Sequence, residues 1–282
     1  MLLFPNCKIN LGLKITGKRA DGYHNIETVF FPVPLRDAIE IIDHNPTLEN
    51  VEFSQSGISI DGLQNDNLCI KAWQLLKNDF PSLPSIKLHL HKAIPMGAGL
   101  GGGSADGSCT LIYLNQKYSL NLSENQLLAY ALQLGSDCPF FIINTPCLAS
   151  GRGELLQPIQ LSLSGYRLVL VNPGIHVNTR WAFSQLKLTE PATNDSTNTK
   201  QSLASIVSGS IDSWKDKLTN DFEMPVFEKF PLIQSIKETL YEKGALYASM
   251  SGSGSSVYGI FNDNKIPTLN FPNHFLINNS AL

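Results

Sequence analysis

The sequence has few charged residues, no long apolar run and no basic excess. Charged residues make up 16% of the 282 residues, and 21 basic against 24 acidic side chains give a formal net charge of -3. A nucleic-acid-binding protein usually carries a basic excess, so we expect no nucleic-acid partner. No apolar stretch approaches the roughly 18 residues that a membrane-spanning helix needs. We therefore expect no membrane partner either.

The cysteines lack the spacing of a disulfide framework or a zinc site. They are five in number, and none forms a C-x-x-C pair. The N-terminus also lacks the basic start and long apolar stretch of a secretory signal. These absences predict reduced, mostly buried thiols in a cytoplasmic protein, which we expect to be a monomer or a homodimer. The cysteines are Cys7, Cys69, Cys109, Cys138 and Cys147.

What is present is a mixture of strand and helix patterns without a steady βαβα rhythm, which favours an α+β fold. Asp66 is a candidate N-cap for the first helix. The polar, aperiodic segment 189–202 predicts an exposed loop. Alternation predicts strands over 8–16 and 86–91. Strands are also predicted over 26–33, 37–43, 166–171, 245–250 and 256–261. Helical spacing predicts helices over 67–78, 104–117, 123–134 and 231–243.

A glycine-rich loop stands out in the middle of the chain, with five glycines between Gly97 and Gly103 and a hydroxyl residue after them. Glycine lets the backbone approach a ligand closely, and the N-terminus of a following helix attracts anions. Because Pro95 and Leu100 interrupt the run, a flexible linker fits poorly. The loop predicts a phosphate cradle, formed by Pro95, Met96, Gly97, Ala98, Gly99, Leu100, Gly101, Gly102, Gly103, Ser104 and Ala105.

The loop alone leaves the kind of nucleotide open. It satisfies the G-x-G-x-x-G pattern of dinucleotide-binding folds, but such a match by itself is weak. That fold needs a buried strand before the loop, whereas His89 and His91 alternate there with apolar residues. A Walker A loop is excluded because no G-K-[S/T] closes the pattern. A nicotinamide-dependent oxidoreductase remains an alternative. The two histidines lack a third ligand, so we interpret them as surface residues and expect no protein-built metal site.

Several stretches together resemble the GHMP kinase superfamily. The glycine loop resembles its second motif, and residues 8–11 with 19–24 resemble its first. Residues 134–141 resemble its catalytic segment, and residues 251–254 its third, C-terminal glycine motif. The segments Gly151–Glu154 and Asn172–Gly174 also fit, and the matches follow the family order over nearly the whole chain.

Two positions depart from the family pattern. Gly107 and Cys138 stand where alanine and valine are expected. Glycine inside a helix costs about 1 kcal/mol relative to alanine, so we expect Gly107 to weaken the helix that follows the loop.

The resemblance implies a two-lobed α+β fold. Its N-terminal lobe, similar to domain 2 of ribosomal protein S5, is expected over residues 1–160, and a ferredoxin-like lobe over 161–282. The superfamily implies transfer of the ATP γ-phosphoryl group with Mg²⁺. The triple glycine before Ser104 resembles one branch, whose acceptor is a small-molecule cytidyl diphosphate derivative of methylerythritol in non-mevalonate isoprenoid synthesis. Superfamily kinases acting on homoserine, mevalonate or a sugar, and a catalytically silent relative, remain alternatives.

The resemblance also implies catalytic roles. Asp137 would take the proton of the acceptor hydroxyl, and Lys8 would be its partner. From the residues alone, Asp137 is equally a helix cap and Lys8 a solvated lysine. Asn10 shares the strand face of Lys8 and would hydrogen-bond the substrate. Ser104 would meet the phosphates or their Mg²⁺.

For the cytidyl group, the resemblance implies an aromatic site. Tyr23 would stack on the cytosine ring while His24 hydrogen-bonds it. Phe183 would be the second stacking ring, with Thr179 nearby. From the residues alone, Tyr23 and His24 are a common surface pair, and Phe183 suits a core position equally well.

Overall fold

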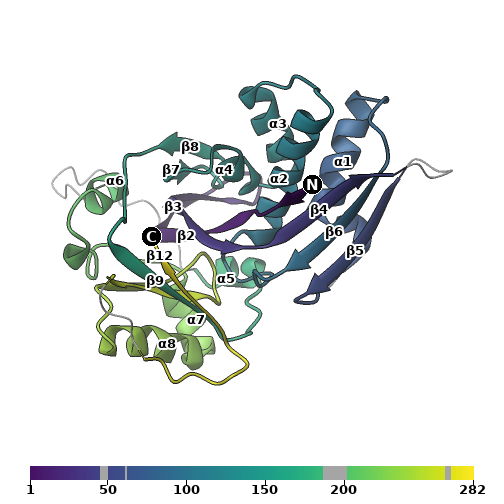
Figure 1. Cartoon of the computed structure of the whole chain (residues 1–282). Coiled ribbons are helices and arrows are strands. Elements are labelled where there is room, and N and C mark those ends of the chain that lie inside the picture. The colour runs from purple at the N-terminus through teal and green to yellow at the C-terminus, as the bar shows by residue number, and fades with distance from the viewer. Residues whose placement is uncertain (45–49, 61, 187–201, 264–267) are drawn as a thin grey trace. The chain divides into compact units, whose positions relative to one another are not determined.

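The computed structural model describes residues 1–44, 50–60, 62–186, 202–263 and 268–282 (Figure 1). The loop predicted over 189–202 lies outside the described residues except for Ser202. Among the described helices, none combines the length and the apolar character needed to cross a bilayer. The chain forms two compact units. The first comprises Met1–Lys8, Pro34–Met96 and Gly101–Asn144, and the second comprises Ile9–Val33, Gly97–Leu100 and Thr145–Leu282.

Strands and helices are both abundant, which confirms the α+β prediction. The strands are β1 (Leu2–Leu3), β2 (Asn6–Lys18), β3 (His24–Arg36), β4 (Ala38–Asp43), β5 (Val51–Gly57), β6 (Ile86–Lys92), β7 (Cys147–Ser150), β8 (Leu155–Pro158), β9 (Tyr166–Asn172), β10 (Tyr247–Met250), β11 (Val257–Asn262) and β12 (Leu276–Ala281). The helices are α1 (Leu68–Asp79), α2 (Gly102–Lys117), α3 (Glu124–Leu134), α4 (Cys138–Ile143), α5 (Thr179–Ser184), α6 (Leu203–Val207), α7 (Glu223–Lys229) and α8 (Pro231–Glu242), with 3-10 turns at Gln64–Asp66 and Ile211–Ser213.

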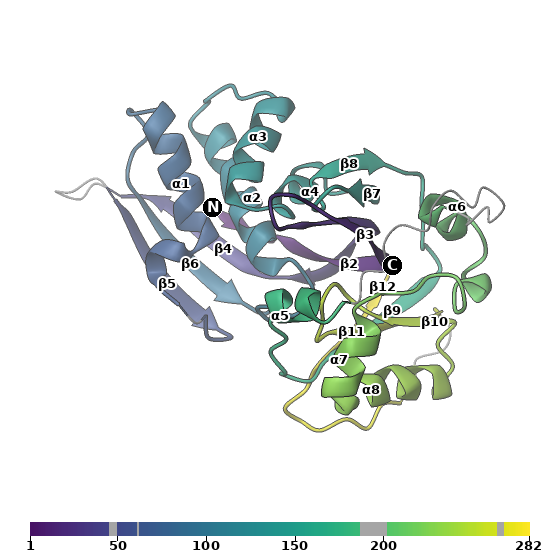
Figure 2. The ribbon, with the colours of Figure 1, turned by 180° about the vertical axis from the view of Figure 1, so that it is seen from behind.

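The first unit is a four-stranded sheet, in the order β1-β4-β6-β5, covered on one face by α1, α2 and α3 (Figures 1 and 2). The alternation predicted for β6 is confirmed. Its apolar residues Ile86, Leu88 and Leu90 are buried in the core against the helices.

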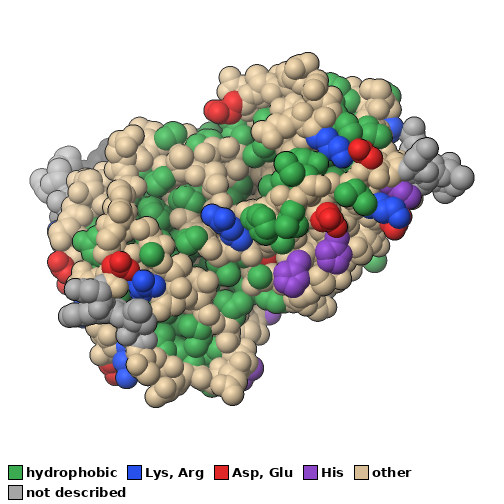
Figure 3. Space-filling view, viewed as in Figure 1, with side chains coloured by type: hydrophobic (Ala, Val, Ile, Leu, Met, Phe, Trp, Pro, Cys, Tyr) green, Lys and Arg blue, Asp and Glu red, His purple; other side chains and the backbone are tan. Residues whose placement is uncertain are grey.

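The opposite face of β6 carries His89 and His91, as the alternation predicts. His89 hydrogen-bonds Ser54 at 2.8 Å and Ser56 at 2.9 Å, and His91 also hydrogen-bonds Ser56. These are exposed contacts, and Figure 3 shows histidine side chains at the surface over this strand. The two histidines are surface residues, as expected.

The strand directions of this sheet argue against the dinucleotide-binding alternative. β6, which leads into the glycine loop, is antiparallel to β4 and parallel only to β5, an edge strand. A dinucleotide-binding fold places its glycine loop after a strand in a mostly parallel, doubly wound sheet. In the described part of this unit, the sheet lacks that arrangement.

The second unit contains an antiparallel sheet in the order β10-β11-β9-β12, with α7 and α8 packed against one face. The last strand, β12, pairs with β9 from Leu276↔Asn172 to Ala281↔Arg167. The C-terminal residues, which match no motif, therefore complete the edge of this sheet. A further sheet has the order β2-β3-β7-β8.

Helix boundaries differ from the sequence predictions at two starts. The cap of α1 is Asn67, whose side chain accepts a hydrogen bond from the Cys69 amide, and not Asp66. α2 starts at Gly102 rather than Ser104, so the last glycines of the loop already belong to the helix. α3 behaves as predicted, because Ser123 forms a capping box with Gln126 and Gly135 follows the last turn.

Gly107 lies where α2 packs closely against α1 and α3. A Cβ at this position of α2 would lie 2.8 Å from Cβ of Leu68 in α1 and 3.3 Å from Cδ1 of Leu134 in α3. Real Cβ atoms do not approach a packed side chain so closely. The low helix propensity of Gly107 is therefore accompanied by a packing role, because the glycine allows α1 and α2 to pack closely.

We predict that Gly107→Ala destabilises the protein despite the better helix propensity of alanine. Overpacking a core costs about 1–3 kcal/mol, which exceeds the gain in propensity of about 1 kcal/mol. Thermal and urea unfolding should show a free energy of unfolding that is lower by up to about 2 kcal/mol, the difference between the two effects. The matched control is Gln116→Ala on the exposed side of the same helix, which should stay within about 0.5 kcal/mol of wild type. An increased stability of Gly107→Ala would contradict the packing role.

Candidate active site

The first unit brings Lys8 and Asp137 together. Lys8 lies on β2 with 4% of its side chain exposed, and its Nζ is 3.5 Å from Oδ2 of Asp137, which precedes α4. Burial lowers the pKa of Lys8, and the negative charge of Asp137 opposes this shift. A buried lysine with one close carboxylate is an arrangement in which the ammonium can orient and stabilise charge on a neighbouring group.

The backbone around Asp137 is fixed by its neighbours. The Cys138 amide donates to the Gly135 carbonyl at 3.1 Å, and the Ser108 hydroxyl donates to the Cys138 carbonyl at 2.8 Å. The Asp137 side chain makes no capping hydrogen bond to α4 and is 34% exposed. Its carboxylate therefore pairs with Lys8 and does not serve as a helix cap.

The part of the glycine loop in the first unit ends in the start of α2. Gly101 is the cap residue, with φ of +69°, and a Cβ there would lie 3.0 Å from the Phe141 ring and 3.3 Å from Cε of Lys8. Only glycine fits both the backbone conformation and the space. The first N–H groups of a helix lack intrahelical partners and carry a partial positive charge, so the Gly102–Ser104 segment is suited to bind phosphate.

The part of the loop in the second unit, Gly97–Leu100, packs against the C-terminal glycine motif. Gly99 has φ of +78°, and a Cβ there would lie 1.9 Å from the Ser251 carbonyl oxygen. The Ser251 hydroxyl donates to the Gly99 carbonyl at 2.8 Å, and the Ser256 amide donates to the Ala98 carbonyl. The second and third glycine motifs are thus in direct contact within this unit.

Asn10 lies in the same unit and holds backbone segments together. Its Nδ2 donates to the Thr28 hydroxyl at 3.0 Å, and its amide N–H donates to the Ser251 hydroxyl at 3.2 Å. The Tyr258 hydroxyl donates to its carbonyl at 2.7 Å. With 2% exposure, Asn10 links β2 to β3, β11 and the C-terminal glycine motif.

The predicted aromatic site residues of the second unit, Tyr23, His24 and Phe183, do not form one cluster. His24 stacks on Phe183 with ring centroids 4.7 Å apart and planes inclined by 12°, and Phe183 packs edge-on against Phe222. Burial lowers the pKa of His24. Tyr23 is 56% exposed and has the Arg152 guanidinium 5.1 Å from its ring centroid. The rings of His24 and Phe183 thus stack on each other, and Tyr23 lies apart from this pair, next to Arg152.

Thr179 begins α5 and contacts the C-terminal glycine motif. Its hydroxyl lies 2.9 Å from the hydroxyl of Ser253. This contact places Thr179 next to the motif that packs against Gly97–Leu100, and four residues before Phe183 on the same helix.

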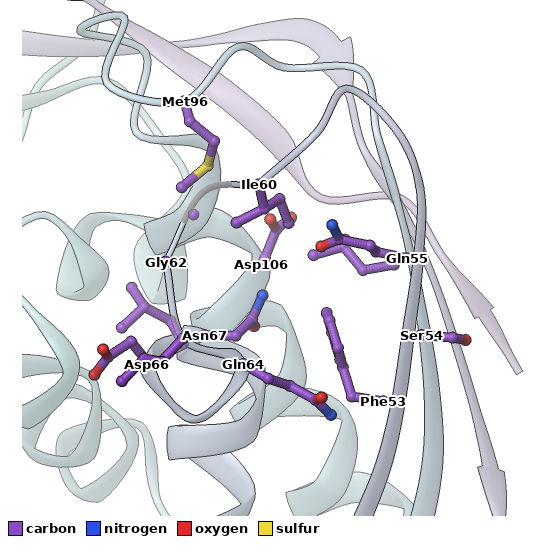
Figure 4. A pocket seen from close by; sticks show the side chains of 14 residues that line it. Phe53, Ser54, Gln55, Ile60, Gly62, Gln64, Asp66, Asn67, Met96 and Asp106 are labelled. Carbon is purple, nitrogen blue, oxygen red and sulfur yellow. The ribbon is translucent and has the colours of Figure 1, made fainter.

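A cavity of about 440 Å³ lies in the first unit beside the glycine loop. Figure 4 shows Asp106 from α2 between Ile60 and Asn67, with Phe53 and Gln55 on the other side. Apolar and polar side chains both line the cavity. Its lining residues are Phe53, Ser54, Gln55, Ile60, Gly62, Leu63, Gln64, Asp66, Asn67, Leu68, Leu90, Met96, Gly103 and Asp106.

Next to the cavity is a buried cluster of charged side chains that no sequence motif predicts. The Lys92 ammonium at the end of β6 donates to Asp106 at 2.8 Å and also to Asp37. Burial raises the pKa of Asp106 to about 7, although Lys92 opposes the shift. Burial by itself lowers the pKa of Lys92, but the two carboxylates outweigh it and the net shift is upward. One sequence signal exists: Lys92 occupies the inward phase of the β6 alternation.

Among the described residues, no three His, Cys, Asp or Glu side chains converge as a metal site. Mg²⁺ in phosphate-transfer sites usually binds through substrate phosphates, waters and one or two protein oxygens. The hydroxyl of Ser104 is an oxygen donor of the kind Mg²⁺ prefers, so the residues fit such an ion without a dedicated cage.

Family models match both parts of the chain. The model for the GHMP kinases N terminal domain matches residues 67–145, and the model for the GHMP kinases C terminal domain matches residues 202–268. A protein of Bacteroides fragilis named 4-diphosphocytidyl-2-C-methyl-D-erythritol kinase is 50% identical over 96% of each chain. A protein of the same name from Chlorobium phaeobacteroides is 38% identical, covering 91% of this chain and 87% of its own.

Solved structures of similar proteins share the fold of this chain. A crystal structure of 4-(cytidine 5'-diphospho)-2C-methyl-D-erythritol kinase has a TM-score of 0.75 and 28% identity, covering 92% of this chain and 89% of its own. Homoserine kinase from Cytophaga hutchinsonii aligns with a TM-score of 0.65 at 15% identity, covering 93% of this chain and 84% of its own. The likeness to homoserine kinase shows the fold alone. The expected two-lobed fold is confirmed.

We predict that the stability difference between Asp106→Asn and wild type depends on pH. A folded-state pKa of about 7 lies above the unfolded value of about 3.9, so folding binds a proton. The stability linked to this proton is present below about pH 4 and is lost as the pH rises through 7, by at most about 4 kcal/mol.

The asparagine variant lacks this titration, and its stability relative to wild type should therefore increase between pH 4 and 8. Urea unfolding across that range measures the difference. Titrating groups that do not interact with Asp106 cancel in the comparison. A difference that stays constant with pH would show that Asp106 does not bind a proton on folding.

Proposed function

Because the chain belongs to the GHMP kinase family, we propose that it phosphorylates the 2-hydroxyl of 4-diphosphocytidyl-2-C-methyl-D-erythritol with ATP, a step of non-mevalonate isoprenoid precursor synthesis. The observation that carries the proposal is the 50% identity over 96% of the chain to a protein of that name. The alternatives within the family act on acceptors without a base, and their solved structures are no more than 18% identical to this chain.

In the proposed reaction, the acceptor hydroxyl oxygen attacks the γ-phosphorus, the bond to the ADP oxygen breaks, and Asp137 takes the hydroxyl proton. Lys8, 3.5 Å from the Asp137 carboxylate, holds it in position and offsets the negative charge that gathers near the transferring group. The exposure of Asp137 and its lack of a capping bond support this role. Mg²⁺, when bound with ATP, supplies further charge neutralisation on the phosphates.

For ATP we propose that the Pro95–Ala105 loop binds the phosphates and that the cavity of about 440 Å³ receives the nucleoside. Met96 and Gly103 belong to the loop and also line the cavity. The first turn of α2 offers N–H groups without intrahelical partners, and the cavity offers apolar side chains, among them Phe53 and Ile60, for a base. Ser104, in the first turn of α2, is proposed to meet the phosphates or their Mg²⁺.

For the acceptor we propose that Tyr23, His24 and Phe183 form the cytosine site, with Asn10 and Thr179 as further substrate contacts. The exposed ring of Tyr23 supports stacking. Since Phe183 stacks on His24 at 4.7 Å, a base placed against Phe183 would replace His24 as its stacking partner. The imidazole would then be left to hydrogen-bond the base.

Four further expectations stay predictions. They are the division into domains at residue 160, the cytoplasmic location, the monomeric or dimeric state, and the lack of a nucleic-acid partner.

A panel of acceptors tests the proposed function. Purified protein with Mg-ATP should release ADP with the cytidyl substrate. Methylerythritol 4-phosphate, which lacks the cytidyl group, should show a kcat/KM at least about tenfold lower, because stacking on one base is worth about 1–3 kcal/mol. Release with homoserine or mevalonate, but not with the cytidyl substrate, would assign a different acceptor to this kinase.

Asp137→Asn should lower kcat by about 10²–10⁴-fold, because the amide cannot accept the hydroxyl proton. Binding of Mg-ATP, measured by calorimetry, should stay close to wild type. The matched control is Asp43→Asn, which removes an exposed carboxylate of the same unit that pairs with Lys117 and should leave kcat within about twofold. Unchanged turnover of Asp137→Asn would remove this residue from the proposed mechanism.

A further inference from the structure

Three charged side chains of the first unit are buried together, next to both ends of the phosphate loop. Asp37, Lys92 and Asp106 are each at most 2% exposed. Lys92 ends β6 shortly before Pro95, where the loop begins. Asp106 follows Ala105 in α2, where the loop ends. Asp37 lies between β3 and β4.

Their contacts hold the chain on both sides of the loop. One oxygen of Asp37 accepts hydrogen bonds from the amides of Ala93 and Ile94, at 2.6 and 2.9 Å. The other oxygen accepts from the Lys92 ammonium, which also donates to Oδ2 of Asp106 at 2.8 Å. The segment that leads into the loop and the helix that follows it are therefore joined through a single ammonium group.

The cluster also reaches the cavity. Asp106 lines it together with Met96 and Gly103. Among the described residues, Oδ1 of Asp106 is buried and has no hydrogen-bond partner. A buried carboxylate oxygen without a hydrogen-bond partner is costly. Above about pH 7, where Asp106 is ionised, this oxygen can only accept a hydrogen bond. A donor group on a bound molecule would satisfy this oxygen.

We propose that the Asp37–Lys92–Asp106 cluster is the positioning device of the phosphate loop, and that an N–H group of the nucleotide base completes it by donating to Oδ1 of Asp106. The inference rests on the proposed placement of the nucleoside in this cavity. In ATP the base carries one such donor, its exocyclic amino group. Base binding and loop geometry are then coupled through Lys92.

The energetics of buried charges support a role beyond stability. Replacing a buried ion pair by apolar residues is often neutral or stabilising, so such pairs contribute little net stability. A cluster of one cation and two carboxylates buried at a loop of this kind is better explained by the geometry that it fixes. Asp37, Lys92 and Asp106 are thus positioning residues, with Asp106 as the one that touches the nucleotide.

The first experiment measures the Kd of Mg-ATP by calorimetry, together with thermal unfolding. Lys92→Met should weaken ATP binding about tenfold or more and lower the Tm, because two carboxylates then lose their cation. Lys92→Met/Asp106→Asn should recover much of the Tm, since one buried charge is removed, but not the ATP affinity. Lys117→Met, at the far end of α2, is the matched control and should bind ATP within about twofold of wild type.

Recovery of ATP affinity together with the Tm in the double variant would overturn the positioning role, because the cluster would then act through stability alone. If Lys92→Met does not fold, the Tm and the Kd of Mg-ATP are compared between the double variant and wild type instead. These measurements need no acceptor. They are therefore independent of whether the cytidyl substrate is the one phosphorylated.

The second experiment tests the link to the base. Purine riboside triphosphate, which is ATP without the amino group, should bind the wild type at least about tenfold more weakly than ATP, as expected for loss of a hydrogen bond to a charged group. Asp106→Leu should bind the two nucleotides within about twofold of each other. Equal binding of both by the wild type would overturn the contact between Asp106 and the base.

Discussion

The burial of a lysine between two carboxylates determines how the first unit presents its glycine loop. A charge taken out of water must be paired and hydrogen-bonded, and Lys92 finds its partners on two different elements. Asp37 in turn holds the amides that follow β6. The chain before the loop and the helix after it are fixed to each other by this requirement, and the start of α2 and the cavity wall are placed with them.

Lys8 is also a buried cation that is paired with a carboxylate, but its pKa shifts in the opposite direction. Its ammonium is as buried as that of Lys92, but its carboxylate partner Asp137 is partly exposed and lies at 3.5 Å. Burial lowers the pKa of Lys8, whereas the closer carboxylates raise that of Lys92. The same side-chain chemistry thus gives one firmly held cluster and one pair whose carboxylate is partly exposed.

The second unit depends on close backbone approach rather than on charge. Gly99 meets the Ser251 carbonyl at a distance that no side chain permits, and Asn10 ties the same segment to β3 and β11. The stacking of His24 on Phe183 brings together two residues far apart in the sequence. Hydrogen bonds to main-chain atoms and ring contacts define this region, which explains why polar residues there are buried without charge.

The amino-acid sequence by itself determined the local features of this protein. Alternation located β2 and β6, Ser123 and Gly135 located the ends of α3, and the order of the glycine motifs indicated the family. Only the tertiary structure decided which residues meet. From the sequence, Gly107 is only a residue of low helix propensity, and its contact with Leu68 is visible only in the structure. Asp37, Lys92 and Asp106 likewise form no pattern along the chain. The phosphate loop is recognisable because its geometry depends on adjacent residues, whereas the cluster that holds it depends on contacts that only folding creates.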